Sequence, residues 1–363
     1  MTTISERLMP VQSSVTKRSW RWMRDNLFST PLNTLISLVC IYIIWNVVGG
    51  LISWAIVNAS FIPGKDACAE ITGACWGYVH ANWRFLMFGT FPPAEYWRPF
   101  VAIMMLTGGM LLTMNRTFWT KWLPVVWIIG FIAVYYILAG GVFGLTPVRT
   151  GLWGGLTLTL VLAVVGIAFA APLALILALG RRSEMPLVKV ICVVFIEVFR
   201  GVPLISVLFM ASVMFPLFLP TGVSVDVLLR AQVGIIVFQA AYLAEVFRGG
   251  MQAIPSGQYE AADSLGLTYW QKMGKIILPQ ALRLVIPPTM STFISLFKDT
   301  SLVVIIGLFD LLAATRAAVN NPEWRPHYIE GYVFIALIYF CFCFFMSRYS
   351  LYLDRSLKKA TSH

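Results

Sequence analysis

Charged side chains are scarce in this sequence. Asp, Glu, Lys and Arg make up 12% of the 363 residues, whereas hydrophobic residues make up 59%. A soluble domain contains about 25% charged and about 45–50% apolar residues. The chain has too little charge to cover a globule in water, so its surplus apolar surface must face lipid. The composition therefore excludes an ordinary soluble protein and predicts an integral membrane protein.

Motifs for catalysis and nucleotide binding are missing as well. The sequence has no Gly-x-x-x-x-Gly-Lys-Ser/Thr loop for ATP, no His-Glu-x-x-His zinc motif and no Gly-x-Ser-x-Gly elbow. Its three histidines, His80, His327 and His363, are too scattered for a metal site. We expect a chain that is not an enzyme and that binds no metal and no cofactor. A partner must then supply the energy for any driven process.

The net charge of +11 does not indicate a nucleic-acid-binding protein. Lys and Arg occur in short clusters between apolar runs, which is typical of membrane-protein loops. A DNA-binding protein would instead concentrate them in one basic stripe. We therefore expect the lipid bilayer as a partner, and no nucleic acid.

Apolar runs of about 20 residues, long enough to cross a bilayer, predict an all-α polytopic protein with about eight transmembrane helices. The fifth run is too long for one straight crossing, and Gly-Val-Pro at 201–203 predicts a bend within it. The eight predicted spans are 34–57, 99–114, 122–143, 154–180, 187–219, 227–247, 287–310 and 330–348.

The distribution of basic residues predicts the orientation. An even number of spans places both termini on one side, and most Lys and Arg residues fall in the termini and loops of that side. By the positive-inside rule, both termini are cytoplasmic. The basic leader precedes the first span without a cleavage site, so we expect an anchor rather than a removable signal peptide. The leader's basic residues are Lys17, Arg18, Arg21 and Arg24.

The six cysteines fall into two groups. Cys68 and Cys75 lie in the long external loop, 58–98, which would face an oxidising compartment. We expect a disulfide between them, and the alternative is two unrelated thiols. The other four fall in apolar spans, where a free cysteine behaves as a small hydrophobe: Cys40, Cys192, Cys341 and Cys343.

The chain divides into regions of different character. Residues 1–148 contain three spans with almost no intramembrane charge, and we interpret them as an N-terminal extension with an external loop. From about residue 150, ionisable side chains enter or border the membrane, where they are costly and usually face a bundle interior or a pathway. We interpret 149–352 as the working core, with a cytoplasmic loop at about 248–286, and 353–363 as a cytoplasmic tail.

The loop at 248–286 contains a predicted short helix. Pro255 and Ser256 favour a helix start, and Gly266 favours a helix end because glycine tolerates a left-handed C-cap. Pro279 is expected to stop the segment that follows. An ordinary amphipathic linker helix would explain these features alone.

Seven positions of this loop form a more specific pattern. The spacing Glu-Ala-Ala, three residues, Gly, nine residues, Ile-x-Leu-Pro resembles the signature of the membrane subunits of ABC importers. The matching residues are Glu260, Ala261, Ala262, Gly266, Ile276, Leu278 and Pro279. The resemblance implies that this loop is the coupling helix that docks into a groove on the ATPase.

Three flanking motifs narrow the resemblance to permeases for polar amino acids (His, Glu, Gln, Arg and opines). They are 199–204, 242–250 and 298–302, and one departure is Val202, where threonine would be expected. The resemblance covers about 149–352, a core of five helices of the type I importer fold. The three-span extension is similar to one permease of the general L-amino-acid importer of Gram-negative bacteria.

This resemblance implies a function and partners. The chain would be the permease subunit of an ATP-driven importer in the bacterial inner membrane, moving polar or general L-amino acids by alternating access. An ATPase dimer that uses ATP and Mg, a second homologous permease and a periplasmic amino-acid-binding protein would complete it. The alternative is a stand-alone secondary amino-acid transporter or channel, which should show inverted repeats with broken helices.

A run of polar residues inside the seventh span is the candidate substrate pathway. Lys298 lies about 17 Å along this helix, near the bilayer midplane, where charge is costly. Lys298 would suit the carboxylate of an amino acid and Asp299 its ammonium group. Alternatively, both pair with Glu197, Arg200 or Glu245 on neighbouring spans. The candidate pathway residues are Lys298, Asp299, Thr300, Ser301 and Glu245.

Two further pairs are expected to be structural. Glu197 and Arg200 are spaced i, i+3 and can pair on one helix face, next to the bend formed by Gly201 and Pro203. Glu245 and Arg248 repeat that spacing at the cytoplasmic end of the sixth span, where we favour a structural or gating role.

Overall fold

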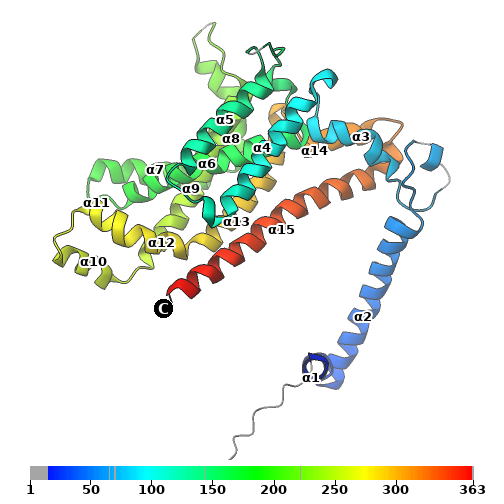
Figure 1. Ribbon diagram of the computed structural model, residues 1–363, viewed down its shortest axis with the longest axis horizontal. Helices are drawn as coiled ribbons and strands as arrows, with labels where there is room; N and C mark the ends of the chain where they lie inside the picture. Colours follow the sequence, from blue (N-terminus) through cyan, green and yellow to red (C-terminus); the bar gives the residue numbers. More distant parts are fainter. Residues whose placement is uncertain (1–14, 65, 69–70, 143, 221, 362–363) are drawn as a thin grey trace, which may run out of the picture. The chain divides into compact units, whose positions relative to one another are not determined.

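The computed structural model describes residues 15–64, 66–68, 71–142, 144–220 and 222–361. These residues are mainly helical and form two compact units, Met1–Gly77 and Tyr78–His363 (Figure 1). The first unit contains α1 (Val15–Leu27), α2 (Pro31–Ile52) and two short turns of helix, Ser53–Val57 and Asp66–Cys68. α3 (Gly77–Phe88) begins at the boundary.

The second unit contains the remaining helices. The longer elements are α4 (Trp97–Met114), α5 (Leu123–Ala139), α6 (Gly155–Arg181), α7 (Pro186–Gly201), α8 (Leu204–Phe209), α9 (Val227–Gln252), α10 (Ser256–Ser264), α11 (Tyr269–Lys272), α12 (Leu278–Leu284), α13 (Ile286–Asp299), β1 (Phe309–Asp310), α14 (Leu311–Asn320) and α15 (Tyr328–Thr361). Short segments of 3₁₀ or π helix are Pro93–Glu95, Arg116–Phe118, Thr150–Leu152, Met210–Met214, Phe215–Phe218, Met273–Ile277, Thr300–Ile306 and Arg325–His327.

Six of the described helices are long and apolar enough to cross a membrane, and a bent pair would make a seventh. The bent pair, Pro186–Gly201 and Leu204–Phe218, turns by 106°. The bend predicted at 201–203 is thus confirmed, because Val202 is extended before Pro203 as proline requires of its predecessor. α5 is apolar but shorter, with 17 residues. The count of eight spans stays a prediction.

The core of the second unit lies where α6 packs along α9. Small residues face each other on both helices, including Ala170 and Ala174 of α6 and Ala240 and Ala244 of α9, all fully buried. Small side chains let two helix backbones approach closely, which is how helices associate inside a bilayer. This contact fixes the two helices that carry Arg181, Glu245 and Arg248.

Residues 78–148 pack with the core, so the structural division at Gly77 does not coincide with the predicted division at 148. The Thr157 hydroxyl of α6 donates to the Met87 carbonyl of α3 at 3.0 Å, which ties this region to the core. Within the region, Arg98 of α4 joins two helices. Its side chain is fully buried and donates to the carbonyls of Ile137 and Leu138 at the end of α5, at 2.6 and 2.9 Å. Cations stabilise the carbonyl end of a helix, and this contact joins α4 to α5.

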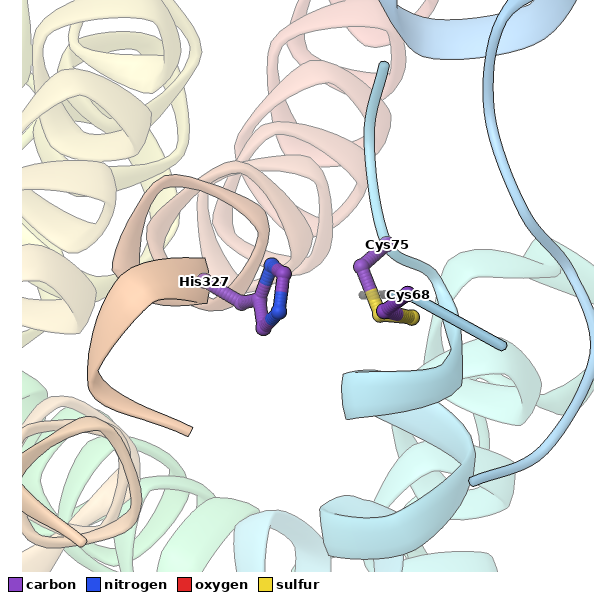
Figure 2. A group of neighbouring side chains, drawn as sticks. All are labelled: Cys68, Cys75 and His327. Atoms are coloured by element: carbon purple, nitrogen blue, oxygen red, sulfur yellow. A yellow bond between two sulfur atoms is a disulfide. The ribbon is translucent and has the colours of Figure 1, made fainter. Parts of the chain in front are cut away.

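The first unit contains the disulfide. Cys68 and Cys75 are joined through their sulfur atoms (Figure 2), so neither offers a thiolate to a metal. The Trp76 ring nitrogen donates to the carbonyl of Ala55 at 2.8 Å and secures the same loop to the end of the α2 segment. At the other terminus, α15 runs to Thr361, and the last two residues of the predicted tail, 362–363, lie outside the described residues.

Candidate functional site

The predicted loop helix is present as α10, and its ends confirm the prediction. It starts at Ser256 after Pro255. It ends before Gly266, whose φ of 68° is the left-handed conformation that favours glycine. The Gly266 amide donates to the Asp263 carbonyl at 2.9 Å, and the Leu267 amide donates to the Ala262 carbonyl at 3.2 Å. These bonds satisfy carbonyls that the helix end would otherwise leave free.

α10 has one packed face and one open face. Ala262 is buried, whereas Glu260 and Ala261 are exposed. Leu265 and Trp270, which follow the helix, are 75% and 72% exposed although they lie outside the membrane-spanning helices. Large apolar side chains left open in this way mark a surface for another protein. α10 therefore presents a shallow polar ridge beside two apolar side chains.

The other residues of the motif lie on the π turn Met273–Ile277 and at the start of α12. Ile276 and Leu278 are half-buried, and Ile277 between them is fully buried together with Met273. Pro279 was expected to stop the segment before it, and the π turn Met273–Ile277 ends two residues before Pro279. Pro279 lies in the first turn of α12, where its missing N–H needs no acceptor.

A side chain that the sequence analysis did not single out supports α10. Arg182, at the end of α6, donates to the Tyr259 hydroxyl at 2.9 Å and stacks 5.3 Å from the ring centroid. The same hydroxyl donates to the Met251 carbonyl at 2.8 Å, which ties α10 to the end of α9. α6, α9 and α10 are thus linked at a single tyrosine.

Arg181, the preceding residue, belongs to a cluster of charges around Glu245. The Glu245 carboxylate, 15% exposed, contacts Arg181 at 2.9 Å, Arg248 at 2.8 Å and Arg200 at 3.7 Å. The pairing of Glu245 with Arg248 is confirmed, because both nitrogens of one guanidinium edge reach the carboxylate. The expected pair of Glu197 with Arg200 is wrong, since Glu197 contacts Arg181 at 2.7 Å instead.

The cluster joins three helices. Arg181 belongs to α6, Glu197 and Arg200 to α7, and Glu245 and Arg248 to α9. The rotation of each helix about its own axis decides which charged side chains of neighbouring helices meet. The spacing of residues within one helix does not reveal that rotation. Arg181 of this cluster is followed directly by Arg182, whose side chain contacts Tyr259 of α10.

The polar residues at 298–301 lie where α13 tightens into a 3₁₀ turn. Lys298 is exposed and Asp299 is half-buried. Thr300 is fully buried and donates to the Phe297 carbonyl at 2.9 Å, and the Ser301 hydroxyl donates to the Lys298 carbonyl at 2.9 Å. Among the described residues, neither Lys298 nor Asp299 forms an ion pair with Glu197, Arg200 or Glu245, so that alternative is wrong.

A fully buried carboxylate was missed. Asp310 is 0% exposed and caps α14, accepting from the amides of Ala313 at 2.9 Å and Leu312 at 3.1 Å. The span ends at Ile306, so Asp310 lies beyond it. Burial raises the pKa of Asp310 to about 6, against the opposing effect of those amides. An acid followed by an apolar helical run was the available sequence signal.

Asp310 also sits against the start of α6. Residues Gly154 and Gly155 form β-bridges with Phe309 and Asp310, and the Leu311 amide donates to the Thr159 hydroxyl at 3.1 Å. The backbone approach to β1 requires glycine at position 154, because a Cβ on Gly154 would lie 2.9 Å from the Phe309 carbonyl oxygen. This end of α6 is thus fixed through backbone groups.

Comparison with known proteins gives a consistent set of relatives. The profile of the family described as "Binding-protein-dependent transport system inner membrane component" matches residues 170–359. The inner membrane amino-acid ABC transporter permease protein YhdY of Escherichia coli (strain K12) is 50% identical over 345 residues, 93% of each chain. The glutamate/glutamine/aspartate/asparagine transport system permease protein BztC of Rhodobacter capsulatus is 37% identical and covers 93% of this chain and 94% of its own.

A solved structure agrees with these relatives. The crystal structure of an amino acid ABC transporter with histidines matches with a TM-score of 0.50 and 30% identity. It covers 56% of this chain and 92% of that chain. The resemblance to membrane subunits of ABC importers, inferred above from seven loop residues, is confirmed.

Proposed function

Because this chain belongs to the family of binding-protein-dependent transport system inner membrane components, we propose that it carries amino acids from the periplasm to the cytoplasm. It is the permease subunit of an ABC importer, and an ATPase and a substrate-binding protein are its partners. ATP and Mg are used in the ATPase, outside this chain. Both termini lie in the cytoplasm, which places α10 on the side of the ATPase.

One observation carries the proposal. α10 is a short capped helix with its polar face open, next to two large exposed apolar side chains, in the loop of the type that couples to an ATPase. Relatives of this chain are named as amino-acid permeases, which supports the substrate class. A second permease subunit, homologous to this one, completes the membrane part.

The contacts at the end of α6 suggest how movement of α10 reaches the spans. ATP binding closes the ATPase dimer and displaces α10. Tyr259 passes this displacement to Arg182 on α6 and to the end of α9. The charge cluster at Glu245 joins these two helices to α7, so the three helices can shift while the acids of the cluster exchange arginine partners. The spans then open outward, and inward opening lowers the affinity for substrate.

Substrate recognition is proposed for the polar turn at 298–301. Asp299 suits the ammonium group of an amino acid, and the exposed Lys298 suits its carboxylate. Thr300 is buried and bonded to the backbone, so its role is to hold the turn.

Co-purification tests the proposal. The chain is isolated from its native membrane in mild detergent, and retained proteins are identified and assayed for ATPase activity. We expect an ATPase to be retained with the native loop and lost with Glu260→Arg or Gly266→Asp. Gly257→Ala is the matched control, because Gly257 is exposed in α10 with open space around its Cα and alanine favours helix.

Uptake of labelled amino acids separates this function from a stand-alone carrier. If uptake persists in Glu260→Arg while no ATPase is retained in any of several detergents, the chain works without an ATPase and the proposal fails. Loss of both uptake and retained ATPase in this variant, with both kept in Gly257→Ala, supports it.

A further inference from the structure

The first helix of the described residues, α1, has two chemically different faces. At about 100° per residue, Met23, Leu27 and Trp20 fall on one side, with Trp22 at its edge, and Arg21 and Arg24 fall on the opposite side. The indoles of Trp20 and Trp22 are 68% and 59% exposed. Apolar and basic residues therefore occupy separate halves of the helix surface.

α1 is held at the beginning of α2. Only residues 28–30 separate the two helices, and the Ser37 hydroxyl of α2 donates to the Leu27 carbonyl of α1 at 2.8 Å. In Figure 1, α1 is seen end-on at the foot of α2, which lies along the page, so the two axes cross. α2 is apolar and long enough to span a bilayer. If α2 crosses the bilayer, α1 lies along its surface.

The charge of α1 matches an anionic surface. The helix sequence contains four basic residues and one acid, Asp25. A basic amphipathic helix with tryptophan on its apolar side is typical of helices that lie in the headgroup region, with the apolar face inserted and the cations toward anionic lipids. A soluble nucleic acid or an acidic protein surface would use the basic face but leave both indoles in water.

We propose that α1 lies in the membrane interface at the end where α2 begins and binds the headgroups of anionic phospholipids. Its apolar face enters the boundary of the acyl chains, and Arg21 and Arg24 contact the phosphates. The orientation proposed above places this surface on the cytoplasmic leaflet, whereas lipid binding itself requires only that α2 spans the membrane. The role is separate from transport and from the ATPase.

Hydrogen exchange of the full chain in nanodiscs tests the proposal. The nanodiscs contain either phosphatidylcholine alone or phosphatidylcholine mixed with anionic phosphatidylglycerol, and exchange is followed by mass spectrometry in peptides covering 15–27. We expect exchange to be slower by about tenfold or more with the anionic lipid, since each basic residue near such a surface favours binding by about fivefold. High salt should reduce this difference.

Matched variants separate lipid binding from general effects of charge. Arg21→Glu with Arg24→Glu should abolish the dependence on phosphatidylglycerol, whereas Arg21→Lys with Arg24→Lys should retain it. Arg149→Glu with Arg325→Glu makes the same change of charge at exposed positions outside α1 and should leave the exchange of 15–27 unchanged. Trp20→Ser with Trp22→Ser should speed exchange in both lipids.

Three outcomes overturn the proposal: equal exchange in both lipids, anionic-lipid protection that survives the double reversal, or protection unaffected by loss of both tryptophans. The co-purified ATPase reports independently on the proposed function. If the ATPase is absent but α1 responds to anionic lipid as described, the importer assignment fails and the lipid site remains.

Discussion

The two ends of α6 are fixed in contrasting ways. At its last residues, Arg181 contacts the carboxylates of Glu197 and Glu245, so the bonding is between side-chain charges. At its first residues, Gly155 and Thr159 contact the β1–α14 junction, where Asp310 accepts from backbone amides. One end has acids shared among several arginines, and the other has a single buried acid with backbone donors.

This difference bears on movement. Glu245 contacts three guanidiniums, and Arg181 contacts two carboxylates, so a small shift can replace one partner by another without leaving a charge unpaired. Backbone bonds to a helix cap offer no such exchange, because the donors are fixed in the first turn of α14. We infer that α6 moves at its α10 end and turns about its α14 end.

Removing Glu245 from the cluster at the last residues of α6 should give the largest effect on stability and uptake. Glu245→Ala leaves Arg181, Arg200 and Arg248 close together without their shared carboxylate. The expected loss of stability is about 1–3 kcal/mol, between an exposed and a buried pair, because Glu245 is partly exposed. Uptake of labelled amino acid should fall by more than tenfold at equal membrane content, checked by immunoblot of the membrane fraction.

Glu245→Gln and Glu245→Asp are the controls for this prediction. Glutamine keeps the shape without the charge and should behave like alanine in uptake, whereas aspartate keeps the charge and should recover part of it. Normal uptake by the glutamine variant would show that the charge cluster does no work in transport.

At the first residues of α6, loss of the Asp310 cap on α14 should lower the stability of the chain and leave the coupling of ATP hydrolysis to uptake unchanged. Asp310→Ala removes the acceptor for the Leu312 and Ala313 amides, with an expected cost of about 1–2 kcal/mol. Asp310→Asn keeps an acceptor oxygen and should retain most of that stability. The measurement is the midpoint of thermal unfolding in detergent at low pH, where the native carboxyl is also neutral.

The pH dependence of the thermal midpoint separates the contribution of the hydrogen bonds at the α14 cap from that of the Asp310 charge. The pKa of Asp310 is raised to about 6 in the folded chain, so the folded state holds this proton more tightly than the unfolded state. This contribution to stability is full below the ordinary pKa of 3.8 and is lost as the pH rises to about 6. Between these two pH values, the thermal midpoint of the wild-type chain should therefore fall relative to that of Asp310→Asn. Parallel curves for the two chains would contradict the assignment.

The sequence and the structure agree best where the determinants are local. The ends of α10 follow from Pro255 and from Gly266, which can adopt the left-handed φ, and the bend at 201–203 follows from the residues themselves. The Glu197–Arg200 pair was wrongly predicted because an i, i+3 spacing cannot reveal an arginine on the neighbouring helix. Asp310 was missed because its burial depends on β1 meeting the start of α6, a contact distant in sequence.

The smallest effect is expected where the charged end of α6 meets α10. Arg182→Ala and Tyr259→Phe each remove the 2.9 Å hydrogen bond between them, and the phenylalanine variant keeps the ring on which the guanidinium stacks. Both positions are accessible to water, so we expect an interaction energy of about 0.5–1 kcal/mol in a double-mutant cycle on unfolding.

The more informative readout of this pair is the ratio of ATP hydrolysed to substrate imported in the reconstituted importer. If Arg182 and Tyr259 carry the movement of α10 into α6, both single variants should raise that ratio. The double variant should raise it no further than Tyr259→Phe, which also removes the bond to the Met251 carbonyl. Arg182→Lys keeps a cation over the ring, so its ratio should lie between that of the wild-type chain and that of Arg182→Ala. Two independent increases that multiply in the double variant would show that the residues act separately, and α10 would then move the spans by another route, such as its contact with the Met273–Ile277 turn.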